Sequence, residues 1–288
     1  MMMPQTGSGR GIAFMLATMI VFAVQDGISR YLAGSYPPIF IVMIRYWAFL
    51  AFVLAISSFQ SGGVVGALRT RHPVLQMARG LLLALQICAV TFSFAQLGLG
   101  ETHAILAINP LVVVAGGALL LSERVSVAQW LAVAIGFVGI TILVGPTGDV
   151  FDPLALIPLV CAFGFAGYQL LTKWVGRSDP PQTSFFYTGL GGAITMTIIG
   201  PFFWTEMLPE DWAFMAALCV TGACGHFLLI KAYEAADASV LQPYAYVQLM
   251  LTSLIGVVIF SEVLTPNLIV GAGIIVGAGL FAWTMRRA

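Results

Sequence analysis

The chain has 288 residues, of which 60% are apolar and only 8% are charged. Because an average soluble domain has roughly 25% charged residues, this composition excludes a water-soluble globule and predicts a protein embedded in lipid. The 12 basic and 12 acidic residues balance, which leaves no basic surface for nucleic acid. The four cysteines lie in apolar runs without paired spacings, so we expect no metal site and no disulfide.

Ten apolar segments are long enough to cross a bilayer as helices, which takes about 20 residues. The joints between them are short and are marked by charged residues, proline or glycine. We therefore expect an all-α membrane protein with ten transmembrane helices. The expected spans are 11–30, 38–58, 75–97, 102–121, 127–145, 153–173, 184–204, 211–231, 239–260 and 266–284.

The positions of lysine and arginine predict the orientation of these spans. If the N-terminus is cytoplasmic, ten of the 12 basic residues fall on the inner side, only Arg30 falls outside, and Arg45 lies within the second span. This bias is typical of cytoplasmic loops and favours an even number of spans with both termini inside. The ten inner residues are Arg10, Arg69, Arg71, Arg79, Arg124, Lys173, Arg177, Lys231, Arg286 and Arg287.

One helix-sized segment occurs twice, at a constant offset of 143 positions. Its first copy contains the pairs Phe22-Ala23, Arg30-Tyr31 and Pro37-Pro38, and these recur as Phe165-Ala166, Lys173-Trp174 and Pro180-Pro181. A duplication predicts two five-helix repeats, covering 1–148 and 149–288. Because five is odd, the second repeat must enter the membrane inverted relative to the first, as in many secondary transporters.

The later segments of the two halves also echo each other. Ser122-Glu123 closes the fourth span as Ser261-Glu262 closes the ninth. Pro110 lies within the fourth span and Pro243 opens the ninth, and we expect both prolines to shape their helices.

In these features the chain resembles the drug/metabolite transporter superfamily, EamA type. The resemblance covers essentially the whole chain, and within the superfamily the sequence is most similar to YddG-type amino-acid exporters. It implies a central cavity lined by helices 1, 3, 4, 6, 8 and 9. It also implies alternating access, in which the two halves rock around that cavity.

Polar side chains near the middle of the membrane are candidates for substrate binding, since they are costly in lipid. Each also has a structural alternative. The amides can join helices by hydrogen bonds, the tyrosines can belong to an interfacial belt, and the histidine can be a packing residue. The candidates are Gln25, Gln86, Asn109, Tyr168, Gln169, His226, Tyr244 and Gln248.

Asp26 and Arg45 form the sharpest charged pair of the sequence. They lie at depths where they could meet near the outer ends of the first two spans. We expect them to form an outer gate or to bind the charged ends of a zwitterion. The alternative is that both side chains extend separately to the outer headgroups.

The sequence contains no motif for an enzyme or an ATP-driven pump. It has no phosphate-binding GxxxxGK[ST], no HExxH and no Gly-x-Ser-x-Gly, and it has no repeated filter loop of a channel. We therefore predict a secondary transporter without a cofactor, which acts on a small-molecule substrate within the bilayer and requires no oligomer.

The predicted substrates are amino acids, which the protein exports with a broad preference for neutral and aromatic ones. A multidrug or lipophilic-cation exporter is the alternative. A nucleotide-sugar or sugar-phosphate carrier is less favoured, because such carriers need fixed cations for phosphate and we expect none at mid-depth. The expected location is the bacterial cytoplasmic membrane, and coupling to protons stays open.

Overall fold

In this computed structural model the described part of the chain, residues 6–59, 62–123, 125–144 and 153–286, has only helical secondary structure. Arg124 and Arg287, both counted above as inner residues, lie outside the described residues. The expected repeat boundary at 148/149 does as well.

The helices follow the expected spans closely. Eight helical stretches in the described ranges are long and apolar enough to cross a membrane, and two shorter apolar helices cover Val127–Ile142 and Pro266–Phe281. A count of ten spans therefore stays a prediction. In chain order the elements are α1 (Thr6–Ala33), α2 (Pro38–Ser58), α3 (Gly63–Leu68), α4 (Pro73–Leu97), α5 (Leu99–Leu106), α6 (Asn109–Leu121), α7 (Val127–Val144), η1 (Pro153–Ala155), α8 (Leu156–Val175), α9 (Pro181–Ile199), η2 (Gly200–Phe203), α10 (Asp211–Ala235), α11 (Ala238–Phe260) and α12 (Pro266–Arg286).

Prolines shape several of these helices. α2 and α9 begin at Pro38 and Pro181, the duplicated prolines of the 143-residue offset, because proline at the first helical position has a suitable φ and needs no backbone partner. α5 ends at Leu106 and α6 begins at Asn109, where Pro110 cannot donate to the carbonyl one turn earlier. Pro243 instead lies inside α11, which continues past it.

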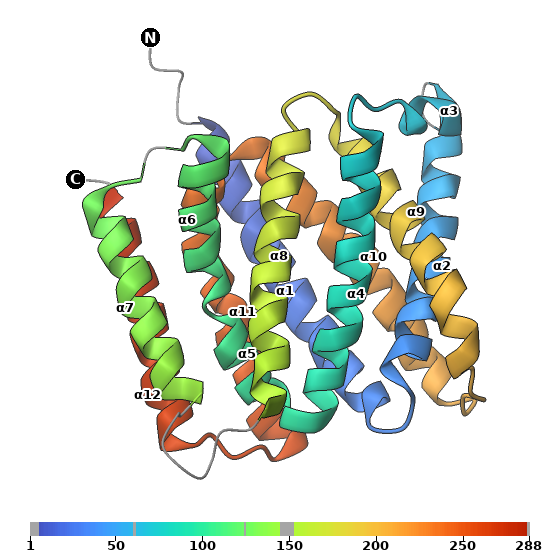
Figure 1. Ribbon diagram of the computed structural model, residues 1–288. Helices are drawn as coiled ribbons and strands as arrows, with labels where there is room; N and C mark the ends of the chain where they lie inside the picture. The colour runs from blue at the N-terminus through green and yellow to red at the C-terminus, as the bar shows by residue number, and fades with distance from the viewer. Residues whose placement is uncertain (1–5, 60–61, 124, 145–152, 287–288) are drawn as a thin grey trace.

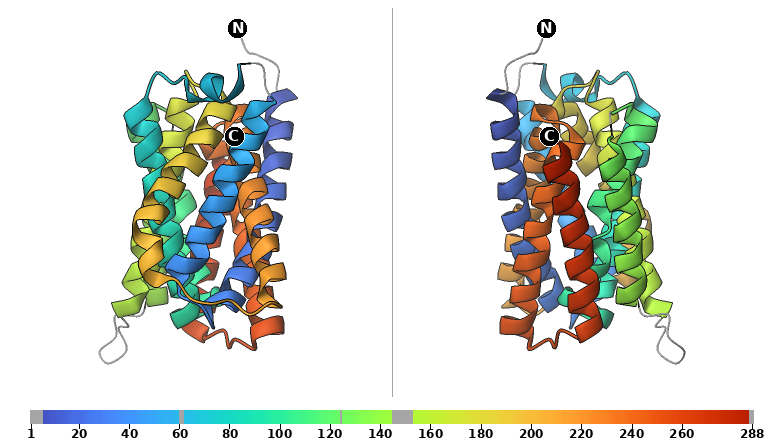
Figure 2. Two further views of the ribbon diagram at one scale, coloured as in Figure 1. Left: turned by 90° about the vertical axis from the view of Figure 1, so that its right-hand side faces the viewer. Right: turned by 90° about the vertical axis from the view of Figure 1, so that its left-hand side faces the viewer.

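The two halves interlock, and their contacts repeat when the halves are exchanged. α1 of the first half packs against α10 and α11 of the second, and α8 of the second packs against α4 and α6 of the first. α2 packs against α9, and α7 packs against α12 at one side of the bundle (Figures 1 and 2). The start of α1 and the end of α12 lie at the same end of the molecule (Figure 1).

A carboxylate joins the halves at each end of the bundle. Asp179, between α8 and α9, accepts hydrogen bonds from the Arg71 backbone N–H at 3.1 Å, from Gln76 Nε2 at 3.0 Å and from the Thr70 hydroxyl. At the other end, Asp211 accepts hydrogen bonds from the Tyr31 hydroxyl at 3.0 Å and the Tyr36 hydroxyl at 2.7 Å. Both carboxylates therefore connect the first repeat to the second.

Arg79 corrects the expectation that it is an inner-loop charge. It lies in α4 with no exposed surface, and its guanidinium donates to Gln76 Oε1 at 2.9 Å, to Thr172 Oγ1 at 3.1 Å and to the Ser184 carbonyl. α4 begins at Pro73, so Arg79 falls in its second turn, where α8 and α9 supply polar partners. The residue therefore joins helices of both halves.

We predict that Asp179→Ala lowers the free energy of unfolding by about 1–3 kcal/mol, because three donors lose their acceptor. Burial raises the pKa of Asp179, but the hydrogen bonds from Thr70, Gln76 and Arg71 outweigh it and bring the pKa below its ordinary value. The stabilisation is therefore present above the unfolded-state pKa of about 4 and is lost as the pH falls through the lower folded-state pKa.

Thermal unfolding of the purified protein in detergent, measured at pH 7 and at successively lower pH, tests this. The difference between wild type and variant should shrink as the pH falls below about 4. Glu234→Gln is the control, since the Glu234 side chain is 49% exposed in a surface pair with Lys231. Equal effects of the two substitutions at pH 7 would contradict the assignment.

Candidate substrate site

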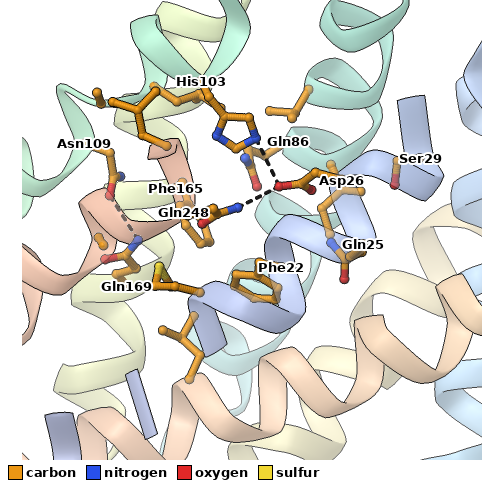
Figure 3. A pocket seen from close by; sticks show the side chains of 18 of the residues that line it. Phe22, Gln25, Asp26, Ser29, Gln86, His103, Asn109, Phe165, Gln169 and Gln248 are labelled. Carbon is orange, nitrogen blue, oxygen red and sulfur yellow. Dashed lines mark hydrogen bonds and ion pairs between the residues drawn. The ribbon is translucent and has the colours of Figure 1, made fainter. Parts of the chain in front are cut away.

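The polar residues of the bundle interior gather around one cavity, shown in Figure 3. The space that it encloses, together with the solvent at its mouth, amounts to about 940 Å³. α1, α4, α5, α6, α8, α10 and α11 line it, and Arg45 reaches it from α2. The lining residues used below are Phe22, Gln25, Asp26, Ser29, Arg45, Gln86, Phe94, His103, Asn109, Phe165, Gln169, His226, Tyr246 and Gln248.

Most of the candidates from the sequence meet at this cavity. Tyr168 and Tyr244 do not line it, although their neighbours do. Tyr168 has no exposed surface, and the Arg79 guanidinium carbon lies 5.2 Å from its ring centre. Those brought together are Gln25, Asp26, Arg45, Gln86, Asn109, Pro110, Gln169, His226 and Gln248.

Asp26 has partners other than the expected Arg45. Its Oδ2 accepts a hydrogen bond from Gln248 Nε2 at 2.7 Å and lies 3.0 Å from His103 Nε2 (Figure 3). The His103 contact is an ion pair when the imidazole is protonated, although its direction does not meet hydrogen-bond geometry. No ion pair between Asp26 and Arg45 occurs among the described residues. The arrangement follows from α1 packing against α11 and α5.

Arg45 brings a buried cation to the wall of the cavity. The residue is only 6% exposed, lines the cavity and lies beside Gln25 against Gly222 of α10. The cavity therefore contains a fixed positive charge and the Asp26 carboxylate without direct contact between them. A solute with both a cationic and an anionic group can bind between them.

Two of the expected binding amides belong to a closed hydrogen-bond network. Asn109 Nδ2 donates to the Ala162 carbonyl at 2.9 Å, and Gln169 Nε2 donates to Asn109 Oδ1 at 3.1 Å. Gln169 Oε1 accepts from Gln242 Nε2 at 3.0 Å and from the Tyr233 hydroxyl. Asn109 and Gln169 therefore connect α6, α8, α10 and α11, as the structural alternative expects of a membrane amide.

Other polar atoms of the cavity wall are buried without a protein partner in the described structure. Such atoms are costly to bury, so a bound solute or water must satisfy them. They project from α1, α4 and α10 around the same space as the rings of Phe22, Phe94 and Phe165. They are Gln25 Oε1, Ser29 Oγ, Gln86 Oε1 and His226 Nδ1. The Tyr246 hydroxyl also has no protein partner in the described structure, but it lies against Gly279 of α12.

The site residues predicted from the sequence do not include Ser29, His103 or Tyr246. Ser29 lies about one turn beyond Gln25 and Asp26 on the same helix face, so the spacing could have identified it. His103 lies at the start of the expected span 102–121, so its position in the sequence gave no reason to place it in a binding site. For Tyr246, only the rotation of α11 decides that this tyrosine lines the cavity while Tyr244 does not.

The fold and the cavity define a multi-pass membrane protein with a solute-sized internal site. The chain belongs to the EamA-like transporter family, whose model matches residues 9–145 and 153–284 as two successive units. It is therefore a membrane transporter of the EamA/drug-metabolite type and not an enzyme.

Several curated proteins are similar over nearly the whole chain. A riboflavin transporter of Vibrio cholerae is 28% identical, with 97% of this chain and 95% of that protein covered. An S-adenosylmethionine uptake transporter of Rickettsia prowazekii is 24% identical (94% and 91%), and the pseudopaline exporter CntI of Pseudomonas aeruginosa is 20% identical (93% and 94%). One crystal structure shares the fold with a TM-score of 0.72 at 18% identity, over 96% of this chain and 99% of its own.

None of the relatives named here is described as an amino-acid exporter. The superfamily expected from the sequence is confirmed, whereas the YddG-type assignment is not supported by these names. Amino-acid export therefore stays a prediction.

The contrast between bonded and unpaired amides can be tested by substitution. We predict that Gln169→Leu lowers the free energy of unfolding by about 1–3 kcal/mol, because Asn109, Tyr233 and Gln242 each lose a partner. Gln86→Leu, which removes an amide oxygen without a protein partner, should change stability by less than about 1 kcal/mol. Thermal unfolding in detergent measures both, and a larger loss for Gln86→Leu would reverse the assignment.

Proposed function

We propose that this chain is a secondary transporter for a flat, nitrogen-containing heteroaromatic metabolite of the size of riboflavin or S-adenosylmethionine. The observation that carries the proposal is a cavity wall that combines phenylalanine rings with unpaired amide, hydroxyl and imidazole atoms. Rings can stack on the flat part of such a solute, and the unpaired atoms can bond its ring nitrogens and oxygens. Two relatives are named for solutes of this kind.

The proposed topology is ten spans in two inverted repeats, 1–148 and 149–288, with both termini on the cytoplasmic side of a bacterial inner membrane. The repeated contacts between the halves and the two successive family matches support the repeats. The distribution of lysine and arginine supports the orientation. Transport then proceeds by alternating access, with the cavity as the site that both sides reach in turn.

Amino-acid transport is the second candidate, and the separated charges of Asp26 and Arg45 favour it. A carboxylate and a guanidinium in one cavity can hold the ammonium and carboxylate groups of a zwitterion. S-adenosylmethionine carries such groups together with an adenine ring, and it therefore uses both features of the cavity.

Counterflow into proteoliposomes distinguishes these candidates. We expect riboflavin or S-adenosylmethionine to exchange faster than phenylalanine, threonine and methyl viologen, because only the first two combine a flat heteroaromatic ring system with several polar groups that can bond the unpaired atoms of the wall. Empty liposomes are the control. Exchange of phenylalanine without either larger solute would establish the second candidate, and exchange of methyl viologen alone would point to drug extrusion.

Charge recognition can be tested within the same assay. Asp26→Asn should raise the S-adenosylmethionine concentration that gives half-maximal exchange about tenfold, because a hydrogen bond to a charged group contributes about 1.5–3 kcal/mol. Arg45→Gln should do the same through the carboxylate of that solute. Neutral riboflavin serves as the internal control and should respond to neither substitution. Equal losses for both solutes would mean that these residues support the fold or the transport cycle and not charge recognition.

A further inference from the structure

Glu262 joins three helices at one end of the bundle. Its Oε1 and Oε2 accept hydrogen bonds, each at 2.8 Å, from the backbone N–H groups of Leu99 and Gly100 in the first turn of α5. Oε1 also lies 3.7 Å from Arg30 Nε of α1, and Glu262 itself follows the end of α11. A carboxylate at a helix N-terminus interacts favourably with the unpaired amides and the helix dipole.

The backbone around Glu262 is shaped to seat this carboxylate. A Cβ at Gly98 would lie 2.7 Å from Oε1, and a Cβ at Gly256 would lie 2.6 Å from Oε2. The preceding Ser261 has a φ of 54°, which is costly for a residue other than glycine. This turn directs the carboxylate back toward α5, because the Glu262 N–H bonds to the Gly256 carbonyl at 3.0 Å.

The same arrangement of a glycine, a serine with positive φ and a glutamate occurs in the other half, 139 positions earlier. At this offset Gly117, Ser122 and Glu123 correspond to Gly256, Ser261 and Glu262. Ser122 has a φ of 58°, and the Glu123 N–H bonds to the Gly117 carbonyl at 3.0 Å. Among the described residues, Ser122 and Ser261 are the two non-glycine positions with positive φ. The two arrangements lie at opposite ends of the bundle, at the α6–α7 and α11–α12 connections (Figure 1).

The two carboxylates differ in what they bind. Both oxygens of Glu123 are buried and accept no hydrogen bond within the described structure. By the same offset of 139 positions, Leu99 and Gly100 correspond to Ala238 and Ser239. α5 begins at Leu99 and α11 begins at Ala238. The N-terminus of α11 is therefore the counterpart of the α5 N-terminus that Glu262 binds.

The basic partner is also duplicated and also differs. Arg30 of α1 corresponds to Lys173 of α8 by the 143-residue offset. Whereas Arg30 lies beside Glu262, Lys173 Nζ donates to the carbonyls of Tyr233 at 3.1 Å and Ala236 at 2.8 Å and lies 3.5 Å from Asp237. One end therefore has a group of glutamate, helix start and cation in contact, whereas at the other end Lys173 pairs with Asp237 beside the start of α11 and Glu123 accepts no hydrogen bond within the described structure.

We propose that Glu262 and Glu123 are paired gate latches that engage alternately during transport. In this structure Glu262 closes the outer end through α1, α5 and α11. In the opposite state Glu262 releases α5, and Glu123 binds the amides of Ala238 and Ser239 to close the inner end. The exchange replaces one carboxylate–amide group by an equivalent one, so the two states can have similar free energies, as a transporter requires. The naming of outer and inner ends rests on the proposed function.

Side-specific labelling of the full-length protein tests the latches without any substrate. Ser29→Cys, in a background with Cys88, Cys161, Cys219 and Cys224 changed to alanine, places one thiol in the cavity wall. The readout is the ratio of labelling rates by a membrane-impermeant maleimide from the outer and the inner face of vesicles.

Glu262→Gln should raise the outer-to-inner labelling ratio about tenfold, because it weakens charged hydrogen bonds of the outer-closed state. Glu123→Gln should lower the ratio, because it weakens only the opposite state. The Ser29→Cys protein without either substitution is the reference. No change in the ratio, or a change in the same direction for both variants, overturns the proposal.

If both ratios change in the direction opposite to this expectation, the latches are retained and the proposed membrane orientation is overturned.

Gly256→Ala and Gly117→Ala form a second matched pair that leaves the charges in place. A Cβ at Gly256 would lie 2.6 Å from Glu262 Oε2, and one at Gly117 would lie 3.1 Å from Glu123 Oε2. They should shift the ratio in the same directions as Glu262→Gln and Glu123→Gln, and a common shift of both would contradict the latch.

Discussion

The need to satisfy polar atoms away from water governs both the site and the ends of this bundle. Inside a bilayer an amide, hydroxyl or helix end finds a partner in the protein or in a water-filled space. Asn109 and Gln169 find partners across helices and hold the halves together. Gln25, Ser29 and Gln86 retain unpaired atoms, and these atoms mark where a solute or water belongs.

Much of the fold follows from patterns along the chain, because apolar length and proline position act locally. The copied Pro38 and Pro181 begin their helices as the duplication predicts. The candidate site is less predictable, since it depends on how helices rotate against one another. Periodicity places Tyr244 and Tyr246 on the same segment, but packing alone decides that Tyr246 lines the cavity. The burial of Arg79 likewise depends on partners from α8 and α9, which are distant in sequence.

The two copies of the repeated segment have the same fold but differ in the side chains that they bring to the cavity. Gln25 and Asp26 correspond by the 143-residue offset to Tyr168 and Gln169. In the first copy, Gln25 and Asp26 face the cavity, with an unpaired oxygen and a carboxylate. In the second copy, Tyr168 packs near Arg79 and Gln169 is bonded within the network. The first repeat therefore supplies the charged recognition groups, and the second supplies much of the internal support.

Helices α1 and α11 connect the candidate site to the proposed outer latch. Asp26 of α1 binds Gln248 of α11, and one turn further along α1, Arg30 lies beside Glu262 at the end of α11. A cationic solute that takes the Asp26 carboxylate competes with Gln248 for it and removes one link between these helices. Helices that separate at Asp26 also carry Arg30 away from Glu262, and this weakens the group that caps α5. Under the proposed function, binding of solute and release of the outer end are therefore coupled through the α1–α11 contact and require no separate signalling element.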